Sequence, residues 1–251
     1  MPESKGRPAA RPARRGRTAP ARPVLGADGC RAGWIGALLL PGELQPAVGV
    51  RSTLHDLMAW AESAAGGEAV ATIAVDMPMG LPEFSIRQAE GLARALLPGR
   101  GSTVFPVLSR AAYCAPDRIE ADRINRALTG RGVGIQAFSL APKILEVDAW
   151  RRTVARHAVV LEAHPELAFA TMAGGPVPTK HKGEGIAVRR ELLAGVGIDA
   201  PEKAPRGATL DDLVDACAVA WVARRFVAGE ARSLPDPPER FSDGYDAAIW
   251  V

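Results

Sequence analysis

The stretch IAVDMPMGLP, residues 73–82, starts with three apolar residues, reaches Asp76 directly after them, and then contains two prolines and a glycine. With the residues before it, it forms VATIAV (70–75), a nearly continuous apolar run typical of a strand covered on both faces of a sheet. The turn-forming residues predict that this strand ends at Asp76. Because sites in open α/β sheets form beyond strand ends, Asp76 is a candidate functional residue.

Three further strands are predicted upstream of this one. VLGADG (24–29), GWIGALLL (33–40) and AVGV (47–50) are short and largely apolar, and their spacing favours an antiparallel meander. The next segment, STLHDLMAWAESAAGG (52–67), has apolar residues at helical spacing and a Gly-Gly stop. The order strand, strand, strand, helix, strand indicates an α/β fold.

Helical patterns dominate residues 80–156, which we expect to form a helical insertion after the fourth strand. Within it, apolar periodicity predicts helices over 86–97, 118–128 and 142–155. HAVVLEAHPE (157–166) then predicts another strand, which is stopped by a proline.

The last part of the chain predicts two more helices and an irregular end. A short helix is expected over 186–197 and a long one over 209–229, where Thr209-x-x-Asp212 is the pattern of a capping box. Residues 235–251 are rich in proline at their start and are expected to form an irregular strap. We therefore expect a single domain over residues 23–251.

The composition is that of an ordinary globular protein, with 47% hydrophobic and 24% charged residues in 251. The three cysteines lie far apart and match neither a zinc motif nor a disulfide framework, so we expect a cytoplasmic location. No apolar run approaches the roughly 18 residues that a membrane helix needs, so no membrane partner is expected.

The charge is divided unevenly along the chain. Residues 1–22 contain seven Lys/Arg and one Glu, a net charge of +6, so the whole-chain charge of +3 leaves −3 for the remainder. This basic tail has almost no large apolar residue and is expected to be disordered. A solvated extension is favoured over a weak binding site for a polyanion.

Four acidic residues are candidates for chemistry. Asp28, Asp76 and Glu162 lie at or near the ends of predicted strands, and Asp215 lies in a mostly apolar part of the long helix, where an unpaired acid is costly. Four neighbouring carboxylates repel one another unless cations bind between them. We therefore predict all four as catalytic, and Asp28, Asp76 and Asp215 as ligands of Mg²⁺ or Mn²⁺, which prefer oxygen donors.

Each acid also has a structural interpretation, which the sequence leaves open. Asp28 could begin a turn, and Asp76 could cap the loop that follows it. Glu162 and His164 could form a hydrogen-bonded structural pair. For Asp212 the role of helix cap is the favoured interpretation.

Five motifs, taken in order, resemble an uncharacterised family described as predicted ribonuclease H-like nucleases (domain of unknown function four-two-nine). The likeness runs from about Val24 to Gly229. The motifs that carry it are ADGCRAGW, AVDMPMGLP, QAFSLAPKILEVD, EAHPE and DDLVDACAVAW.

The resemblance implies a ribonuclease H-like core, with a five-stranded mixed sheet whose first three strands are antiparallel, and with flanking helices. It would place Asp28 at the end of the first strand, Asp76 at the end of the fourth and Asp215 on the last core helix. The family's E-x-H-P-E segment is matched by Glu162, His164 and Glu166. One departure concerns the first inserted helix, where the family often has a Cys-Asp pair and this chain has QAEGLAR after Arg87.

The first functional hypothesis is a metal-dependent nuclease that hydrolyses phosphodiester bonds of nucleic acid through a two-metal carboxylate site. One alternative is a nucleotide-binding phosphotransferase or ATPase of the actin-like type, which also begins with a strand-Asp-Gly turn. Another is a non-catalytic adaptor that retains the fold. The candidate substrate-binding residues are Arg31, Lys143, His164, Lys180 and Lys182.

Overall fold

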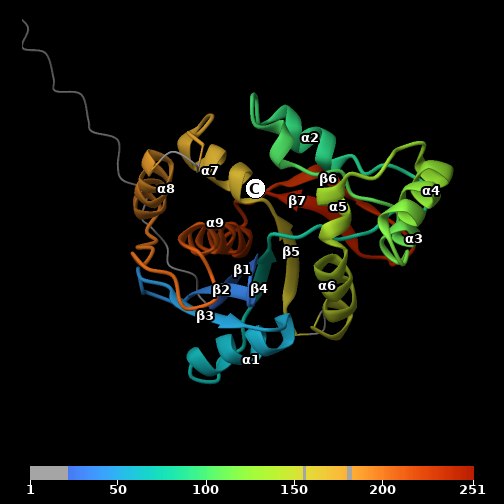
Figure 1. Cartoon of the computed structure of the whole chain (residues 1–251). Coiled ribbons are helices and arrows are strands. Elements are labelled where there is room, and N and C mark those ends of the chain that lie inside the picture. The colour runs from blue at the N-terminus through green and yellow to red at the C-terminus, as the bar shows by residue number, and fades with distance from the viewer. Residues whose placement is uncertain (1–21, 155–156, 180–182) are drawn as a thin grey trace, which may run out of the picture.

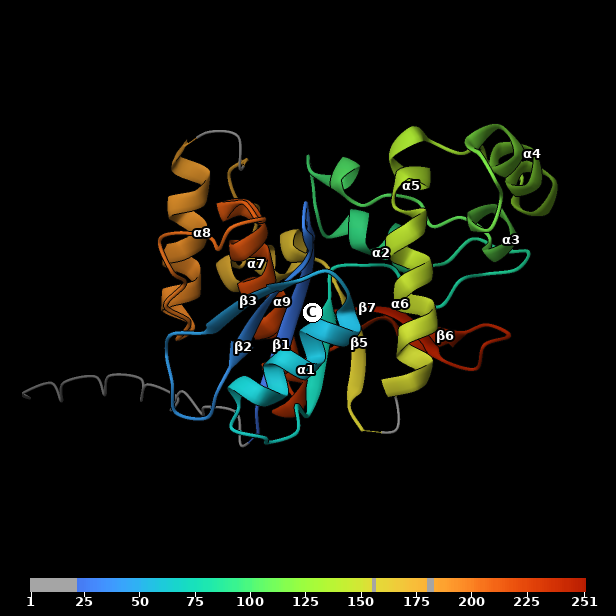
Figure 2. The same ribbon diagram turned by 60° about the horizontal axis from the view of Figure 1, so that its bottom comes forward.

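The computed structural model describes residues 22–154, 157–179 and 183–251, and it is a mixed α/β structure (Figure 1). Seven strands form one sheet in the order β3-β2-β1-β4-β5-β7-β6. Helices lie on both faces of this sheet, as the two views in Figures 1 and 2 show. Except for Arg22, the predicted disordered tail lies outside the described residues.

The first three strands form the antiparallel meander that the sequence predicts. β1 (Val24–Cys30) pairs antiparallel with β2 (Gly33–Leu39), which pairs antiparallel with β3 (Ala47–Arg51). On its other side β1 pairs in parallel with β4 (Thr72–Val75), and β4 pairs in parallel with β5 (Val159–Ala163). The carboxyl ends of β1, β4 and β5 therefore meet at one edge of the sheet.

The C-terminal segment forms two further strands, so both the irregular strap and the count of five strands were wrong. β6 (Ser233–Arg240) and β7 (Asp246–Trp250) form an antiparallel pair, and β7 also pairs in parallel with β5. The three prolines of β6 obscured the strand in the sequence. They are tolerated because β6 is the edge strand, where a missing N–H costs no bond to a further neighbour.

One face of the sheet is covered by the long helix α9 (Leu210–Val227), whose inner side is almost entirely buried. Gly26 on β1 allows this close approach. A Cβ atom at this position would lie 2.2 Å from the main-chain oxygen of Ala216 and 2.3 Å from the nitrogen of Ala220. Because Asp28 lies two residues further along β1, its side chain is on the α9 face.

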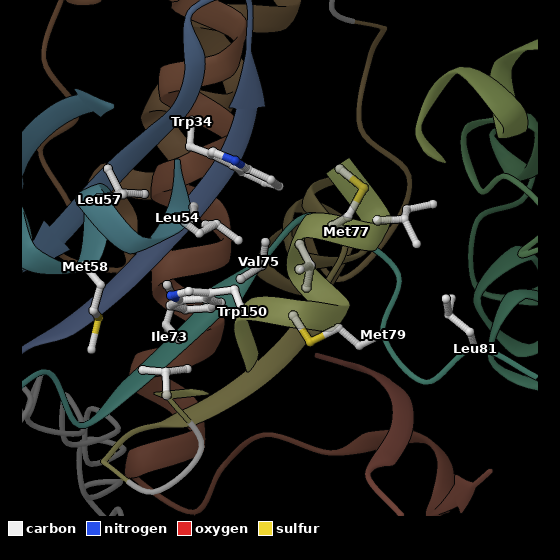
Figure 3. Close-up of a cluster of buried hydrophobic side chains, with 14 of the residues drawn as sticks. Trp34, Leu54, Leu57, Met58, Ile73, Val75, Met77, Met79, Leu81 and Trp150 are labelled. Carbon is white, nitrogen blue, oxygen red and sulfur yellow. The ribbon is translucent and has the colours of Figure 1, made fainter. Parts of the chain in front are cut away.

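The opposite face is covered by α1 (Leu54–Ala64) and α6 (Ala141–Val154), which together with the sheet bury the largest apolar cluster. Figure 3 shows part of this cluster, in which α1, β4 and α6 meet. Its members include Leu54, Leu57, Ile73, Val75 and Trp150.

The described residues between β4 and β5 form helical elements and loops. In order these are α2 (Ala89–Ala95), the short 3₁₀ helix η1 (Gly101–Thr103), α3 (Arg110–Tyr113), α4 (Arg118–Thr129), α5 (Ile135–Ser139) and α6. After β5 come α7 (Pro165–Ala173), which the sequence analysis missed, and α8 (Gly183–Gly195).

The start of α9 confirms the predicted capping box. The Thr209 hydroxyl accepts from the Asp212 N–H, and the Asp212 carboxylate accepts from the Thr209 N–H at 2.8 Å. Asp212 is thus a helix cap, the interpretation the sequence favoured. Within the part of the chain that the structure describes, every helix is too short or too polar to cross a bilayer.

Candidate functional site

A cavity of about 240 Å³ lies beyond the carboxyl ends of the parallel strands. Its wall combines residues at or just after the ends of β1, β4 and β5 with residues from the loop after η1 and from α6. Most of the lining is apolar. The ionisable or polar side chains that line it are Asp28, Asp76, Glu90, Thr103, Tyr113, Lys143, Glu162 and His164.

Two of the predicted acids enter this cavity from neighbouring strands. Ala27 is opposite Val75 in the parallel ladder, and the Asp76 N–H donates to the Ala27 carbonyl at 2.9 Å. Asp28 and Asp76 are the next residues after this pair, so they lie side by side at the strand ends. The Asp28 carboxylate is buried and accepts the Gly29 N–H at 2.6 Å, whereas Asp76 is half-buried. Alternation places both side chains on the α9 face.

Asp215 is buried on α9 but is not among the described residues that line the cavity. Burial and, to a smaller extent, the charge of Asp215 raise the pKa of the Cys217 thiol to about 12. Among residues 22–154, 157–179 and 183–251, no group of three or more His, Cys, Asp or Glu side chains is arranged to hold a metal ion. A preformed three-carboxylate cage is therefore not a feature of the described chain.

The donor set that remains in the cavity still suits a hard cation. Mg²⁺ commonly uses only one or two protein carboxylates and completes its shell with water and substrate phosphate oxygens. Asp28 and Asp76 both offer oxygen atoms to one cavity. Two adjacent carboxylates in a partly buried site also repel each other, which a divalent cation relieves.

Glu162 lines the same cavity but is held by an arginine. Arg87 donates to both Glu162 oxygens at 2.9 Å, and the Met79 N–H donates to one of them at 2.7 Å. Both side chains are almost fully buried. Burial raises the pKa of the Glu162 carboxyl, and Arg87 opposes this rise. These contacts favour a buried structural ion pair over a catalytic group for Glu162.

Glu90 was not singled out in the sequence, yet it faces the cavity from α2. It is buried and forms an ion pair with Arg87 at 3.1 Å, so two carboxylates share one guanidinium. Burial raises the pKa of Glu90 to about 7; Arg87 lowers it and the Glu162 charge raises it. The available signal was the Arg87-x-x-Glu90 spacing on a predicted helix, which places the two side chains side by side.

The raised pKa of Glu90 predicts a pH-dependent stability. Because the folded-state pKa of about 7 exceeds the ordinary value of 4.5, the folded protein binds more protons than the unfolded chain between these pH values. The contribution of Glu90 is fully present below pH 4.5 and is lost as the pH rises through 7, at a cost on the order of 3 kcal/mol. We expect Glu90→Gln to remove this component, as measured by urea unfolding at pH 4.5 and pH 8.

The exposed Glu43 provides the control for this measurement, because Glu43→Gln also removes one carboxylate but does so in solvent. The control should keep the pH dependence of the wild type. Equal pH dependence in wild type and Glu90→Gln would contradict the assignment of this titration to Glu90.

Two of the three ionisable side chains of the E-x-H-P-E segment line the cavity, and the third, Glu166, does not. His164 lines the cavity, and its Nε2 lies 3.2 Å from the Thr103 carbonyl oxygen. Glu166 points elsewhere, into a buried cluster in which Arg189 contacts both its oxygens at 2.9 and 3.0 Å and Arg100 contacts one at 3.0 Å. Glu166 thereby ties α7 to α8 and to the loop before η1.

The predicted substrate-binding residues are spread unevenly. Lys143 lines the cavity from α6, where its Nζ donates to the Gly33 carbonyl at 2.5 Å and lies 4.3 Å from the centre of the Trp34 ring. Arg31 is exposed in the turn between β1 and β2 and does not line the cavity. Lys180 and Lys182 lie outside the described residues, so their predicted role has no structural test.

Together, the fold and the cavity define a mixed α/β protein with a pair of strand-end carboxylates in a largely apolar cavity. The chain belongs to the family described as Protein of unknown function (DUF429), whose model matches residues 26–240. The match confirms the uncharacterised family, domain of unknown function four-two-nine, to which the five sequence motifs pointed. No curated protein matches the chain, and no solved structure does.

Proposed function

We propose that this protein is a metal-dependent phosphodiesterase that acts on nucleic acid, with Asp28 and Asp76 at the centre of its site. The observation that carries the proposal is that these two acids line one cavity from the ends of adjacent parallel strands. The arrangement of β1 to β5, three antiparallel strands followed by two parallel ones in the order 3-2-1-4-5, supports a ribonuclease H-like core that β7 and β6 extend.

In this proposal Asp28 and Asp76 hold Mg²⁺ or Mn²⁺ through their carboxylate oxygens. Such an ion, when bound, would supply Lewis-acid polarisation of a phosphoryl oxygen. Lys143 brings a positive charge to the same wall, which suits an anionic substrate. His164, whose Nε2 lies near the Thr103 carbonyl, is positioned to orient a water or a phosphate oxygen. The apolar remainder of the wall limits water and strengthens these interactions.

The test is cleavage of a panel of labelled single strands, duplexes, RNA–DNA hybrids and junctions in the presence of Mg²⁺ or Mn²⁺. We expect at least one polymer to be cleaved with metal and to remain intact when EDTA is added. The same reactions should include ATP and GTP. Hydrolysis of the nucleoside triphosphates without cleavage of any polymer would instead support the phosphotransferase or ATPase alternative, and activity on neither would contradict both.

A further inference from the structure

A second cavity, of about 550 Å³, opens where β5 and β7 separate. These parallel strands pair only through Glu162 with Ile249 and Ala163 with Trp250. The earlier parts of both strands, which are not paired with each other, line the cavity instead. Strand main chain that lacks a ladder partner offers N–H and C=O groups to a ligand.

The cavity contains a buried arginine that no carboxylate of the described residues pairs with. Arg151, near the end of α6, is only 4% exposed and lines the cavity. Its Nη1 has no hydrogen-bond partner among the described residues, and none of their carboxylates forms an ion pair with it. Its guanidinium lies over the face of Tyr245, with Cζ 4.0 Å from the ring centre.

The surrounding charges explain why Arg151 lacks an acid. Asp148 is bound by Arg110 and Arg152, and Asp243 is bound by Arg110. Arg110, Arg151 and Arg152 therefore have two nearby carboxylates between them. The positive charge of Arg151 is the one that neither carboxylate pairs with. Burial lowers the pKa of Arg151, and the charges of Asp243 and Asp148 oppose this effect. Native proteins rarely leave a buried charge without a partner, so a bound anion is the expected complement.

The other ionisable lining residues make the cavity net positive. Its two acids are already paired, Glu162 with Arg87 and Asp246 with Arg240. Arg22 adds a second cation to the lining, where its Nη2 lies 3.4 Å from the Ala69 carbonyl. Two uncompensated guanidinium groups match the charge of a phosphomonoester, which is about −1.5 to −2 near neutral pH.

Aromatic rings provide the apolar part of the same cavity. Tyr245, Trp250 and Phe226 line it, and the last two form an edge-to-face pair with ring centres 4.9 Å apart. A volume of this size lies in the range of small-molecule sites. The combination suits a ligand that joins a phosphate group to a flat ring system.

We propose that the cavity between β5 and β7 is a binding site for a small phosphomonoester with an aromatic ring, such as a nucleoside monophosphate, and that Arg151 binds its phosphate group. The site is separate from the pair Asp28 and Asp76, and it does not depend on the proposed phosphodiesterase activity. The arginine supplies a bidentate donor, the open strand edges supply hydrogen bonds, and the rings contact the base.

The test is calorimetric titration of the full chain, without divalent metal, using AMP, inorganic phosphate and adenosine as separate probes. We expect AMP to bind most tightly, phosphate to bind more weakly, and adenosine to show no binding at the same concentrations. Arg151→Met, which keeps the length of the side chain but removes its charge, should weaken AMP binding at least tenfold. Arg151→Lys should give an intermediate loss.

Arg123→Met is the control, because it also replaces an arginine by methionine but does so away from the cavity, where the exposed Arg123 is paired with Glu120. Its AMP affinity should stay within about twofold of the wild type. Thermal unfolding of each variant separates loss of the site from loss of the fold: AMP should raise the Tm of wild type and Arg123→Met but not that of Arg151→Met. Failure of AMP and phosphate to bind the wild type, or equal AMP affinity in Arg151→Met and wild type, would overturn the proposal.

Discussion

Asp28→Asn is expected to lower the rate of metal-dependent phosphodiester cleavage by about a thousandfold or more while the protein stays folded. Asparagine has nearly the same shape and keeps an oxygen that can accept the Gly29 N–H, which Asp28 binds at 2.6 Å. It lacks the negative charge that would hold the cation. Loss of several kcal/mol of charge stabilisation corresponds to a rate loss of this size, at about 1.4 kcal/mol per tenfold. Initial rates with Mg²⁺ and with Mn²⁺ measure it.

Two further variants sharpen this experiment. Asp76→Asn should give a comparable loss, because Asp76 lines the same cavity from the neighbouring strand. Asp199→Asn removes one exposed carboxylate elsewhere and should keep the wild-type rate. Circular dichroism and Tm check that each variant is folded. If wild type and Asp28→Asn cleave at equal rates, the activity does not come from this site.

Arg87→Met is expected to lower the free energy of unfolding by about 3–5 kcal/mol at pH 7. The substitution keeps the volume of the side chain but leaves Glu162 and Glu90 buried together without their shared cation. It also removes the hydrogen bond of 2.6 Å from Arg87 to the Met79 carbonyl. Urea unfolding followed by fluorescence gives the change in stability.

The control is Arg123→Met, which breaks an ion pair with Glu120 at the surface, where the arginine side chain is 71% exposed. Exposed pairs of this kind contribute little to stability, so this variant should unfold close to wild type. The defect of Arg87→Met should shrink at pH 5, because protonation removes the uncompensated charge. Similar stabilities for the two variants at pH 7 would show that the buried cluster does not stabilise the fold.

Helices and strands could be predicted from the sequence where the residues within the segment itself determine its structure. Periodicity and turn residues defined β1 to β5 and most helices, because these elements bury one face or two in a regular pattern. The C-terminal strands escaped prediction because β7 pairs with β5, whose partner residues lie 87 positions upstream. The prolines of β6 are also unfavourable in a strand anywhere except at a sheet edge. Helix α7 was hidden by its start directly after the strand, at Pro165.

The candidate site could be predicted only in part. Strand-end position and alternation were enough to select Asp28 and Asp76, which share the cavity. The ion pair of Glu162 could not be predicted from the sequence, because its partner Arg87 lies 75 residues away in the chain and comes near only when the protein folds. The same applies to Asp215, whose burial was anticipated but whose position relative to the cavity depends on how α9 sits on β1.

The cavity lined by Asp28 and Asp76 has a wall made of two parts of the chain, which differ in how well they tolerate changes of sequence. The acids Asp28 and Asp76 belong to paired strands of the sheet, where a shift in one strand disturbs its neighbours. Much of the remaining wall, including Thr103, Phe105, Tyr113 and Leu140, comes from the long segment between β4 and β5. Insertions and exchanges in that segment can therefore change the shape and chemistry of the wall without disturbing the two acids, so selection can alter which molecules fit this cavity while the carboxylate pair stays in place.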